Sequence, residues 1–291
     1  MNIENNIKET ALIFEGGGMR ASYTAGILNT LLENEIYFNY VAGISAGSSH
    51  TVNYISRDKE RAKKSFVDFV NDPNFGGWKS FFKGEGLFRA KYIYEEACLN
   101  DDCLPFDFET FKKNSADLRI GAFNRRTGKL KYFTKDDIET IHDLMKIVRC
   151  SSSLPFFMPP TYYREEYYLD GGLAGGIPLD AALKDGFEKF FVVLTREKGY
   201  KKEPKKHMGL MKILYREYPY LLKAMAKRHI VYNKTLEKLR KLEKQGKAYL
   251  VYPEQMPVDY KETNNKKLEH SYNLGYKQGQ KEINKWRKFL D

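Results

Sequence analysis

Two strand–turn–helix units in the first 55 residues constrain the fold of this chain more than any other feature. An apolar run over 11–15 stops at three consecutive glycines, and residues 20–33 then place apolar side chains at helical spacing. A second short run over 40–42 meets Gly43 and is followed by the small, polar stretch 46–55, which is typical of a helix. Successive units of this kind predict a parallel sheet covered by helices on both faces.

The alternation of strand and helix patterns continues to about residue 195. Residues 118–124 and 130–134 flank the turn sequence RRTGK, which indicates a hairpin added to the sheet. After this hairpin, we expect a helix over 136–148, a strand over 162–168 that bends at 164–166, a helix that opens at Pro178, and a buried strand over 189–195.

Two other stretches have patterns of their own. The segment 59–109 reads as helix and aromatic-rich loop and is expected to form a lid; its interrupting glycines are Gly76, Gly77, Gly84 and Gly86. The last third predicts a long basic helix over 205–245 with a kink at Pro219, a strand over 248–252, and a second basic helix over 266–290.

The net charge of +11 is unevenly distributed along the chain. Residues 196–291 hold 25 Lys/Arg against 11 Asp/Glu, a formal charge of +14, whereas the first 195 residues carry −3. This division points to an anionic partner such as a phospholipid surface, and a solvated face that keeps the protein soluble is the alternative. We therefore expect a core over 10–195, packed against and completed by a basic, mainly helical region over 196–291.

Several protein classes do not fit the sequence. No apolar run approaches the roughly 18 residues of a membrane span, and the longest strongly apolar stretch is 190–194. The first ten residues lack the basic end and apolar middle of a signal peptide, so a cytoplasmic location is expected. Neither a disulfide framework nor a metal site is expected from an odd set of cysteines without CxxC spacing, namely Cys98, Cys103 and Cys150.

The segment GISAG at 43–47 matches G-x-S-x-G, the pattern of a serine held on a sharp strand-to-helix turn. Small flanking residues let the backbone crowd there, so that the Ser45 hydroxyl is presented at a helix N-terminus. The match is weak alone, but a strand pattern ends directly before it and a helix pattern begins directly after it. The alternative is a tight turn in which Ser45 only caps the helix. The elbow residues around this candidate nucleophile are Gly43, Ala46 and Gly47.

The segment GGGMR at 16–20 ends the first strand pattern, where consecutive backbone N–H groups can converge on developing negative charge. The competing interpretation is a G-x-G-x-x-A dinucleotide motif that ends at Ala21. That motif needs an acidic residue at the end of the second strand, whereas this strand ends in Ala42 and Gly43. We therefore favour an oxyanion hole, with the candidate residues Gly16, Gly17, Gly18 and Met19.

The segment DGG at 170–172 follows a third strand pattern. An aspartate there can point into a cleft, although a turn that merely ends a strand is the alternative for Asp170. A serine hydroxyl is a poor nucleophile until a neighbouring base takes its proton. No histidine stands in a catalytic context, so a histidine triad is not expected; the five are His50, His142, His207, His229 and His270.

Four segments in order give the chain a resemblance to a known family: GGGMR at 16–20, GISAG at 43–47, SSSLPFFMPP at 151–160 and DGG at 170–172. With them, the sequence from about 11 to 195 resembles the patatin-like phospholipases, in particular their bacterial members. The resemblance implies a three-layer α/β/α fold with a mostly parallel central sheet. It also makes 10–195 a patatin-like catalytic core.

The same resemblance implies roles for individual residues. Ser45 and Asp170 stand at the positions of a Ser-Asp dyad that needs no histidine, and Arg20 orders the glycine loop or binds an anion beside it. Residues 151–160 would supply an apolar wall, with plain core packing as the alternative. The family often has asparagine and proline after DGG, whereas residues 173–178 keep only Ile-Pro, which leaves the substrate preference open.

From these observations we expect a serine acyl hydrolase that cleaves carboxylic esters of lipids, as a phospholipase A or lysophospholipase does, through an acyl-Ser45 intermediate. No metal or organic cofactor is implied, and nucleic acid is not an expected partner because no recognised module is present. Peripheral contact with an anionic membrane surface is expected of the basic region. The alternative is a non-catalytic lipid- or membrane-surface-binding protein that acts through this region. The oligomeric state is left open.

Overall fold

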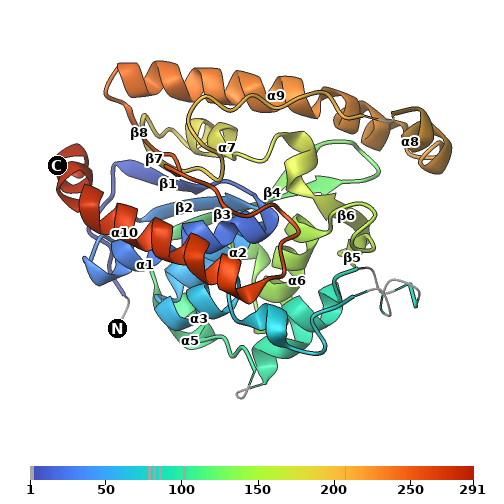
Figure 1. Ribbon diagram of the computed structural model, residues 1–291, viewed down its shortest axis with the longest axis horizontal. Coiled ribbons are helices and arrows are strands. Elements are labelled where there is room, and N and C mark those ends of the chain that lie inside the picture. The colour runs from blue at the N-terminus through green and yellow to red at the C-terminus, as the bar shows by residue number, and fades with distance from the viewer. Residues whose placement is uncertain (1–2, 78–79, 81–82, 85–86, 101–102, 207) are drawn as a thin grey trace.

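In a computed structural model, which describes residues 3–77, 80, 83–84, 87–100, 103–206 and 208–291, an eight-stranded sheet lies at the centre (Figure 1). The strand order is β5-β6-β3-β2-β1-β7-β8, and β4 pairs with β3 off this path. The strands are β1 (Thr10–Phe14), β2 (Tyr40–Ile44), β3 (Asp117–Asn124), β4 (Leu130–Phe133), β5 (Thr161–Tyr163), β6 (Glu166–Asp170), β7 (Lys189–Val193) and β8 (Ala248–Val251).

The sheet is mostly parallel, as the sequence predicted. Its neighbours β3, β2, β1, β7 and β8 run parallel to one another, whereas β4 and β6 pair antiparallel with β3, and β5 pairs antiparallel with β6. The β3–β4 hairpin was predicted correctly around its RRTGK turn. The bend at Arg164 and Glu165 likewise separates β5 from β6.

Helices cover both faces, which makes the fold a three-layer α/β/α arrangement (Figure 1). On one side lie α7 and α9, and on the other lie α1, α2 and α10. Within the described residues, the α-helices are α1 (Ala21–Glu33), α2 (Ala46–Ile55), α3 (Lys59–Lys64), α5 (Phe108–Lys113), α6 (Ile141–Ser152), α7 (Leu179–Lys184), α8 (Met208–Leu214), α9 (Pro219–Lys244) and α10 (Asn265–Leu290).

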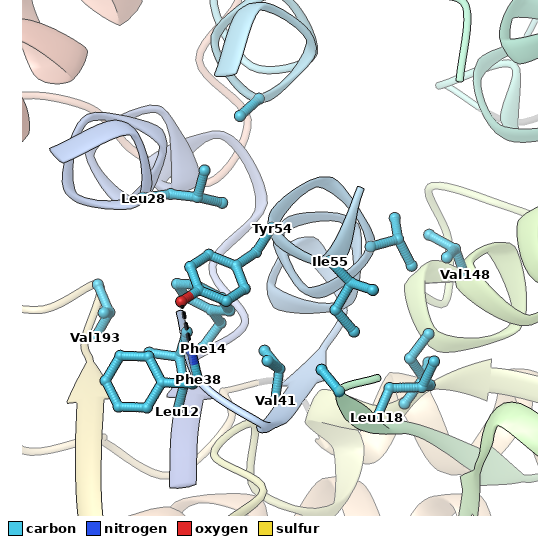
Figure 2. Close-up of a cluster of buried hydrophobic side chains, with 14 of the residues drawn as sticks. Leu12, Phe14, Leu28, Phe38, Val41, Tyr54, Ile55, Leu118, Val148 and Val193 are labelled. Atoms are coloured by element: carbon cyan, nitrogen blue, oxygen red, sulfur yellow. Dashed lines mark hydrogen bonds between the residues drawn. The ribbon is translucent and has the colours of Figure 1, made fainter. Parts of the chain in front are cut away.

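Side chains along the buried strands point alternately to the two faces of the sheet, and this divides the core into two layers. In β1, Leu12 and Phe14 belong to the cluster on the α1, α2 and α10 side, whereas Ala11 and Ile13 belong to the cluster beneath α7 and α9. Figure 2 shows the first of these clusters, with the Tyr54 hydroxyl accepting a hydrogen bond of 2.9 Å from the Phe38 backbone N–H. Because successive side chains of a strand point to opposite faces, a strand buried on both sides is apolar throughout.

The basic C-terminal region takes part in both the sheet and its covering layer. Strand β8 pairs parallel with β7, and α10 lies along α1 (Figure 1). The helices approach closely, since a Cβ at Gly26 would lie 2.3 Å from the Tyr272 carbonyl oxygen and one at Gly275 would lie 2.1 Å from that of Tyr23. The division of the chain into regions at residue 195 stays a prediction.

Two predictions of helices need correction. The stretch 205–245 is not one kinked helix: α8 ends at Leu214 and α9 begins at Pro219, because a proline at the first helical position loses no hydrogen bond. The helix predicted over 136–148 begins later, at Ile141, where Thr140 and Asp143 form a capping box. In the segment 59–109, the described residues combine short helical stretches with loop, and Gly86 lies outside them. None of the described helices is long and apolar enough to span a membrane.

Candidate active site

Ser45 lies at the junction of β2 and α2 in a backbone conformation that non-glycine residues rarely adopt, with φ 58° and ψ −129°. Strain of this kind persists only where the surroundings fix it. The Ser45 N–H donates to Ser151 Oγ over 2.9 Å, and this hydroxyl donates to the Gly121 carbonyl oxygen over 2.6 Å. The sequence did not indicate this supporting role of Ser151, because the segment 151–160 was interpreted as an apolar wall or as core packing.

The small residues of the elbow are required by close backbone packing. A Cβ at Gly47 would lie 2.3 Å from the Phe14 carbonyl oxygen, and one at Gly43 would lie 2.2 Å from that of Gly47. Real Cβ atoms do not approach carbonyl oxygens this closely, so only glycine fits at either position. Ala46, at the first position of α2, lines the same cavity as Ser45. The predicted elbow residues therefore surround the serine in the structure.

Asp170, at the end of β6, meets Ser45 across the sheet. The Ser45 hydroxyl donates to Asp170 Oδ2 over 2.6 Å, and the other carboxylate oxygen accepts a 2.6 Å hydrogen bond from the Gly172 N–H. The Asp170 side chain is buried, with 1% exposure. Both carboxylate oxygens are thus held, and one of them is placed where it can accept the serine proton.

Burial raises the pKa of the Asp170 carboxyl above its ordinary range. The Ser45 hydroxyl, the charge of Arg228 and the Gly172 N–H act in the opposite direction, because each stabilises the carboxylate. A carboxylate with a raised pKa is a stronger proton acceptor than one in water. The environment of Asp170 therefore suits a base better than an ordinary surface aspartate does.

The glycine loop lies beside Ser45, since a Cβ at Gly16 would be 3.0 Å from the Ser45 Cβ. Not all of its N–H groups are free: Gly16 N–H donates to the Gly176 carbonyl oxygen and Met19 N–H to that of Tyr260. Among the described residues, the N–H groups of Gly17 and Gly18 have no such partner. Of the four residues predicted to form an oxyanion hole, Gly17 and Gly18 therefore keep a backbone N–H available for an oxyanion.

Arg20 is buried behind the glycine loop and reaches it through Thr195. Its Nε donates to the Thr195 carbonyl oxygen over 3.1 Å, and the Thr195 hydroxyl donates to the Gly16 carbonyl oxygen over 3.4 Å. Glu15 accepts the Thr195 N–H over 2.6 Å. Burial lowers the pKa of Arg20 to about 10, with the charge of Arg196 acting in the same direction. This arrangement fits a loop-ordering role, which stays a prediction.

The described histidines are not part of the site around Ser45. His50 is fully buried, its Nε2 lies 2.8 Å from the Ala21 carbonyl oxygen, and burial lowers its pKa to about 4. It is a core residue packed against Phe66. None of the described histidines lines the cavity around Ser45, and His207 lies outside the described residues. No group of described His, Cys, Asp and Glu side chains could hold a metal ion.

A cavity of about 270 Å³ contains Ser45, Asp170 and the glycine loop. Much of its wall is apolar and comes from the segment 59–109 and from 151–160, as predicted for the latter; the side chains include Phe66, Phe69, Phe88, Leu104, Leu154 and Phe157. A second part of the wall is basic, and sequence reasoning did not find it. Its side chains are Arg196, Lys202, Lys205 and Arg228.

Comparison with known proteins agrees with this architecture. The model of the patatin-like phospholipase family matches residues 12–183, and that of a domain of unknown function (DUF6363) matches 218–291. The chain is 24% identical over 190 residues to the uncharacterized protein YjjU of Escherichia coli and 25% identical over 185 residues to the probable lipid hydrolase 463L of Invertebrate iridescent virus 6. These matches cover 64% and 60% of the chain, but only 51% and 63% of those relatives.

Among solved structures, VipD of Legionella pneumophila is similar in fold. The TM-score is 0.52 at 12% identity, over 97% of this chain and 67% of VipD. At this identity the likeness concerns the fold alone. The family match covers more than half of the chain and includes the elbow serine, the glycine loop and the aspartate. The chain belongs to the patatin-like phospholipase family.

Proposed function

We propose that this protein is a serine acyl hydrolase that cleaves carboxylic esters of lipids through an acyl-Ser45 intermediate. The observation that carries the proposal is the 2.6 Å hydrogen bond from the strained elbow serine to the buried Asp170 carboxylate. A serine that only capped α2 would need no buried base on a distant strand. Indeed, the Ser45 side chain makes no cap hydrogen bond to α2.

The chemistry follows from these positions. Asp170 takes the hydroxyl proton as Ser45 Oγ attacks the ester carbonyl carbon, and the carbonyl oxygen becomes an oxyanion. The free N–H groups of Gly17 and Gly18 are proposed to stabilise this oxyanion. The tetrahedral intermediate collapses when Asp170 returns the proton to the leaving alcohol. A water molecule, activated by Asp170, then attacks the acyl-serine and releases the carboxylic acid.

The apolar wall favours lipid esters over small, polar ones. Aromatic and aliphatic side chains such as Phe66, Leu104 and Leu154 line the cavity beside Ser45 and would take the acyl chain. Each CH₂ group that leaves water contributes about 0.8 kcal/mol, so a medium or long chain gains substantial binding energy. Phospholipase A and lysophospholipase activities are both compatible with this shape.

Contact with an anionic membrane surface is part of the proposal. Helix α8 exposes three apolar side chains, Leu210, Ile213 and Leu214, with exposures of 54%, 72% and 55%. The cavity wall lies close to this helix, because Tyr215 packs edge-on against Phe156 at 5.1 Å between ring centres. An apolar helix face within a basic region is typical of a segment that lies in a membrane interface.

Activity measurements with matched variants test the proposal. Purified protein is expected to hydrolyse short-chain p-nitrophenyl esters and to release fatty acid from phospholipid or lysophospholipid vesicles. Ser45→Ala should remove both activities without lowering the melting temperature. Full activity in folded Ser45→Ala would assign the nucleophile elsewhere. Binding to vesicles by wild-type protein that hydrolyses no ester would favour the alternative, a lipid-surface-binding protein.

A further inference from the structure

Four basic side chains gather on one side of the active-site cavity. We name Arg196, Lys202, Lys205 and Arg228 the cationic cluster; all four line the cavity that contains Ser45 and Asp170. They come from two separate parts of the chain, the loop after β7 and helix α9. Lys205 is exposed at the edge of the cavity, whereas Arg196 and Lys202 are partly buried in its wall.

The cationic cluster has no carboxylate partner of its own. Within the described part of the chain, none of its members forms an ion pair. The cavity carboxylates are engaged elsewhere: Glu15 accepts from the Thr195 N–H and the Tyr232 hydroxyl, and Asp170 accepts from Ser45 and Gly172. The buried Nε of Arg196 has no hydrogen-bond partner among the described residues. The four basic side chains therefore bring positive charge to the cavity that no ion pair within the described residues engages.

The cluster extends from the dyad along the cavity wall. Arg228 Nε donates to the Gly172 carbonyl oxygen over 2.6 Å, two residues from the candidate base. Lys202 Nζ lies 4.3 Å from the centre of the Tyr232 ring, and Lys205 Nζ lies 5.2 Å from that of Phe156. These ring contacts hold the ammonium groups without neutralising them. An anion bound here would lie beside the reacting ester and would leave the apolar wall free for an acyl chain.

The pKa of Lys202 reflects both its burial and the positive charges around it. Burial lowers its pKa to about 7, and the charges of Arg228, Arg20 and Arg196 add to this effect, opposed by Glu15. Burial and Arg228 also lower the pKa of Lys205. Such mutual repulsion costs stability unless an anion binds, and a bound anion would favour the charged form of each lysine.

We propose that the cationic cluster is a subsite for the phosphate of a lipid substrate's head group, which selects anionic phospholipids or lysophospholipids over neutral esters. The inference rests on the proposed hydrolase function. Two guanidinium groups and two ammonium groups suit phosphate oxygens, which accept several charge-assisted hydrogen bonds at once. Arg228 lies in the stretch that matches the domain of unknown function, so this region would contribute directly to substrate choice.

The test compares two lipids that differ only in the phosphate, 1-oleoylglycerol and 1-oleoylglycerol 3-phosphate. Each is presented at the same mole fraction in micelles of a neutral detergent at constant ionic strength, so that the detergent itself contributes no surface charge in either assay. The measured quantity is the ratio of kcat/KM for the phosphorylated over the neutral lipid. Wild-type protein is expected to favour the phosphorylated lipid by about tenfold or more, as charge-assisted hydrogen bonds of ordinary strength would give.

The variant Lys202→Gln/Lys205→Gln leaves the Arg228–Gly172 contact in place and should reduce this ratio at least about tenfold. Arg228→Gln should reduce it as well. The matched control is Lys238→Gln, since Lys238 lies on α9, is exposed and does not line the cavity; its ratio should equal that of wild type. Melting temperatures show that each variant is folded.

Other outcomes separate the two proposals. Folded wild-type protein that hydrolyses neither these lipids nor a p-nitrophenyl ester would refute the hydrolase function itself. Hydrolysis of the p-nitrophenyl ester alone would overturn the subsite. Hydrolysis of both with equal kcat/KM, or a preference that survives the double lysine substitution, would overturn the subsite alone. A free anion is distinguished by adding inorganic phosphate to the neutral-lipid assay, with chloride at equal ionic strength as the reference. A change in rate specific to phosphate, without a preference between the lipids, would assign the cluster to a free anion and contradict the inference.

Discussion

Replacing Asp170 by asparagine tests the dyad with little change of shape. The asparagine Oδ1 can still accept the Gly172 N–H, and its amide nitrogen takes the place of Oδ2 opposite the Ser45 hydroxyl. That amide nitrogen donates hydrogen bonds and accepts none, so the direction of the hydrogen bond with Ser45 is reversed. The hydroxyl proton then has no acceptor, while the packing around residue 170 is kept.

The size of the effect follows from the loss of a general base. Such a base typically contributes about 10²- to 10⁴-fold in rate, which corresponds to roughly 3–5 kcal/mol of the activation barrier. Because burial disfavours the ionised carboxylate, removing the charge should not destabilise the fold. We therefore expect Asp170→Asn to lower kcat by at least about 10² while its melting temperature stays at or above that of wild type.

Steady-state hydrolysis of p-nitrophenyl butyrate, with thermal melting on the same samples, measures both quantities. The raised pKa of Asp170 adds a further expectation: wild-type activity should be lost as the pH falls through that pKa, because the protonated carboxyl cannot accept the serine proton. A folded Asp170→Asn with near wild-type kcat would refute the dyad. Loss of activity on replacement of His50 or His142, with Asp170→Asn still active, would require a triad.

Three further outcomes are expected. Gly18→Ala should lower kcat/KM about 10²- to 10³-fold, because Gly18 has φ 56° and its new Cβ would lie 2.4 Å from the Tyr260 carbonyl oxygen; Gly209→Ala, whose Cβ meets open space, is the control in the same ester assay. His50 takes up a proton near pH 6.5 when unfolded but only near pH 4 when folded, so roughly 3 kcal/mol of stability should be lost as the pH falls between these values, and urea unfolding of His50→Gln should lack this part of the pH dependence. Ile213→Asp should weaken co-sedimentation with anionic vesicles and leave hydrolysis of a soluble short-chain ester unchanged; undiminished binding would remove α8 from the membrane contact.

The local part of the fold was predictable from the sequence. The units β1–α1 and β2–α2 are indicated by an apolar run, a glycine turn and a helical pattern within a few residues of one another. Ser45 was found for the same reason, since an elbow needs small neighbours directly beside the serine. Asp170 was found through its DGG motif, and its closeness to Ser45 was an expectation of the family resemblance.

The remaining parts depend on contacts between distant segments, which leave no local pattern. Ser151 supports the elbow through its hydroxyl, yet in sequence it is one of three adjacent serines before an apolar stretch. Arg228 reaches the site because α9 packs over the sheet, and its surroundings in sequence resemble any basic helix. The backbone N–H groups of Gly16 and Met19 likewise bond to Gly176 and Tyr260, which are distant in sequence. Only the structure therefore shows that these N–H groups are engaged.

Identification of the residue that reacts with a fluorophosphonate tests the central claim most directly. Fluorophosphonates phosphonylate serines that a neighbouring base has activated, so digestion and tandem mass spectrometry of the treated protein report the nucleophile itself. The account predicts a single modified peptide with the adduct on Ser45, complete loss of ester hydrolysis at one adduct per chain, and no labelling of Ser45→Ala. An unlabelled, folded wild-type protein, or an adduct that persists in Ser45→Ala, would contradict it.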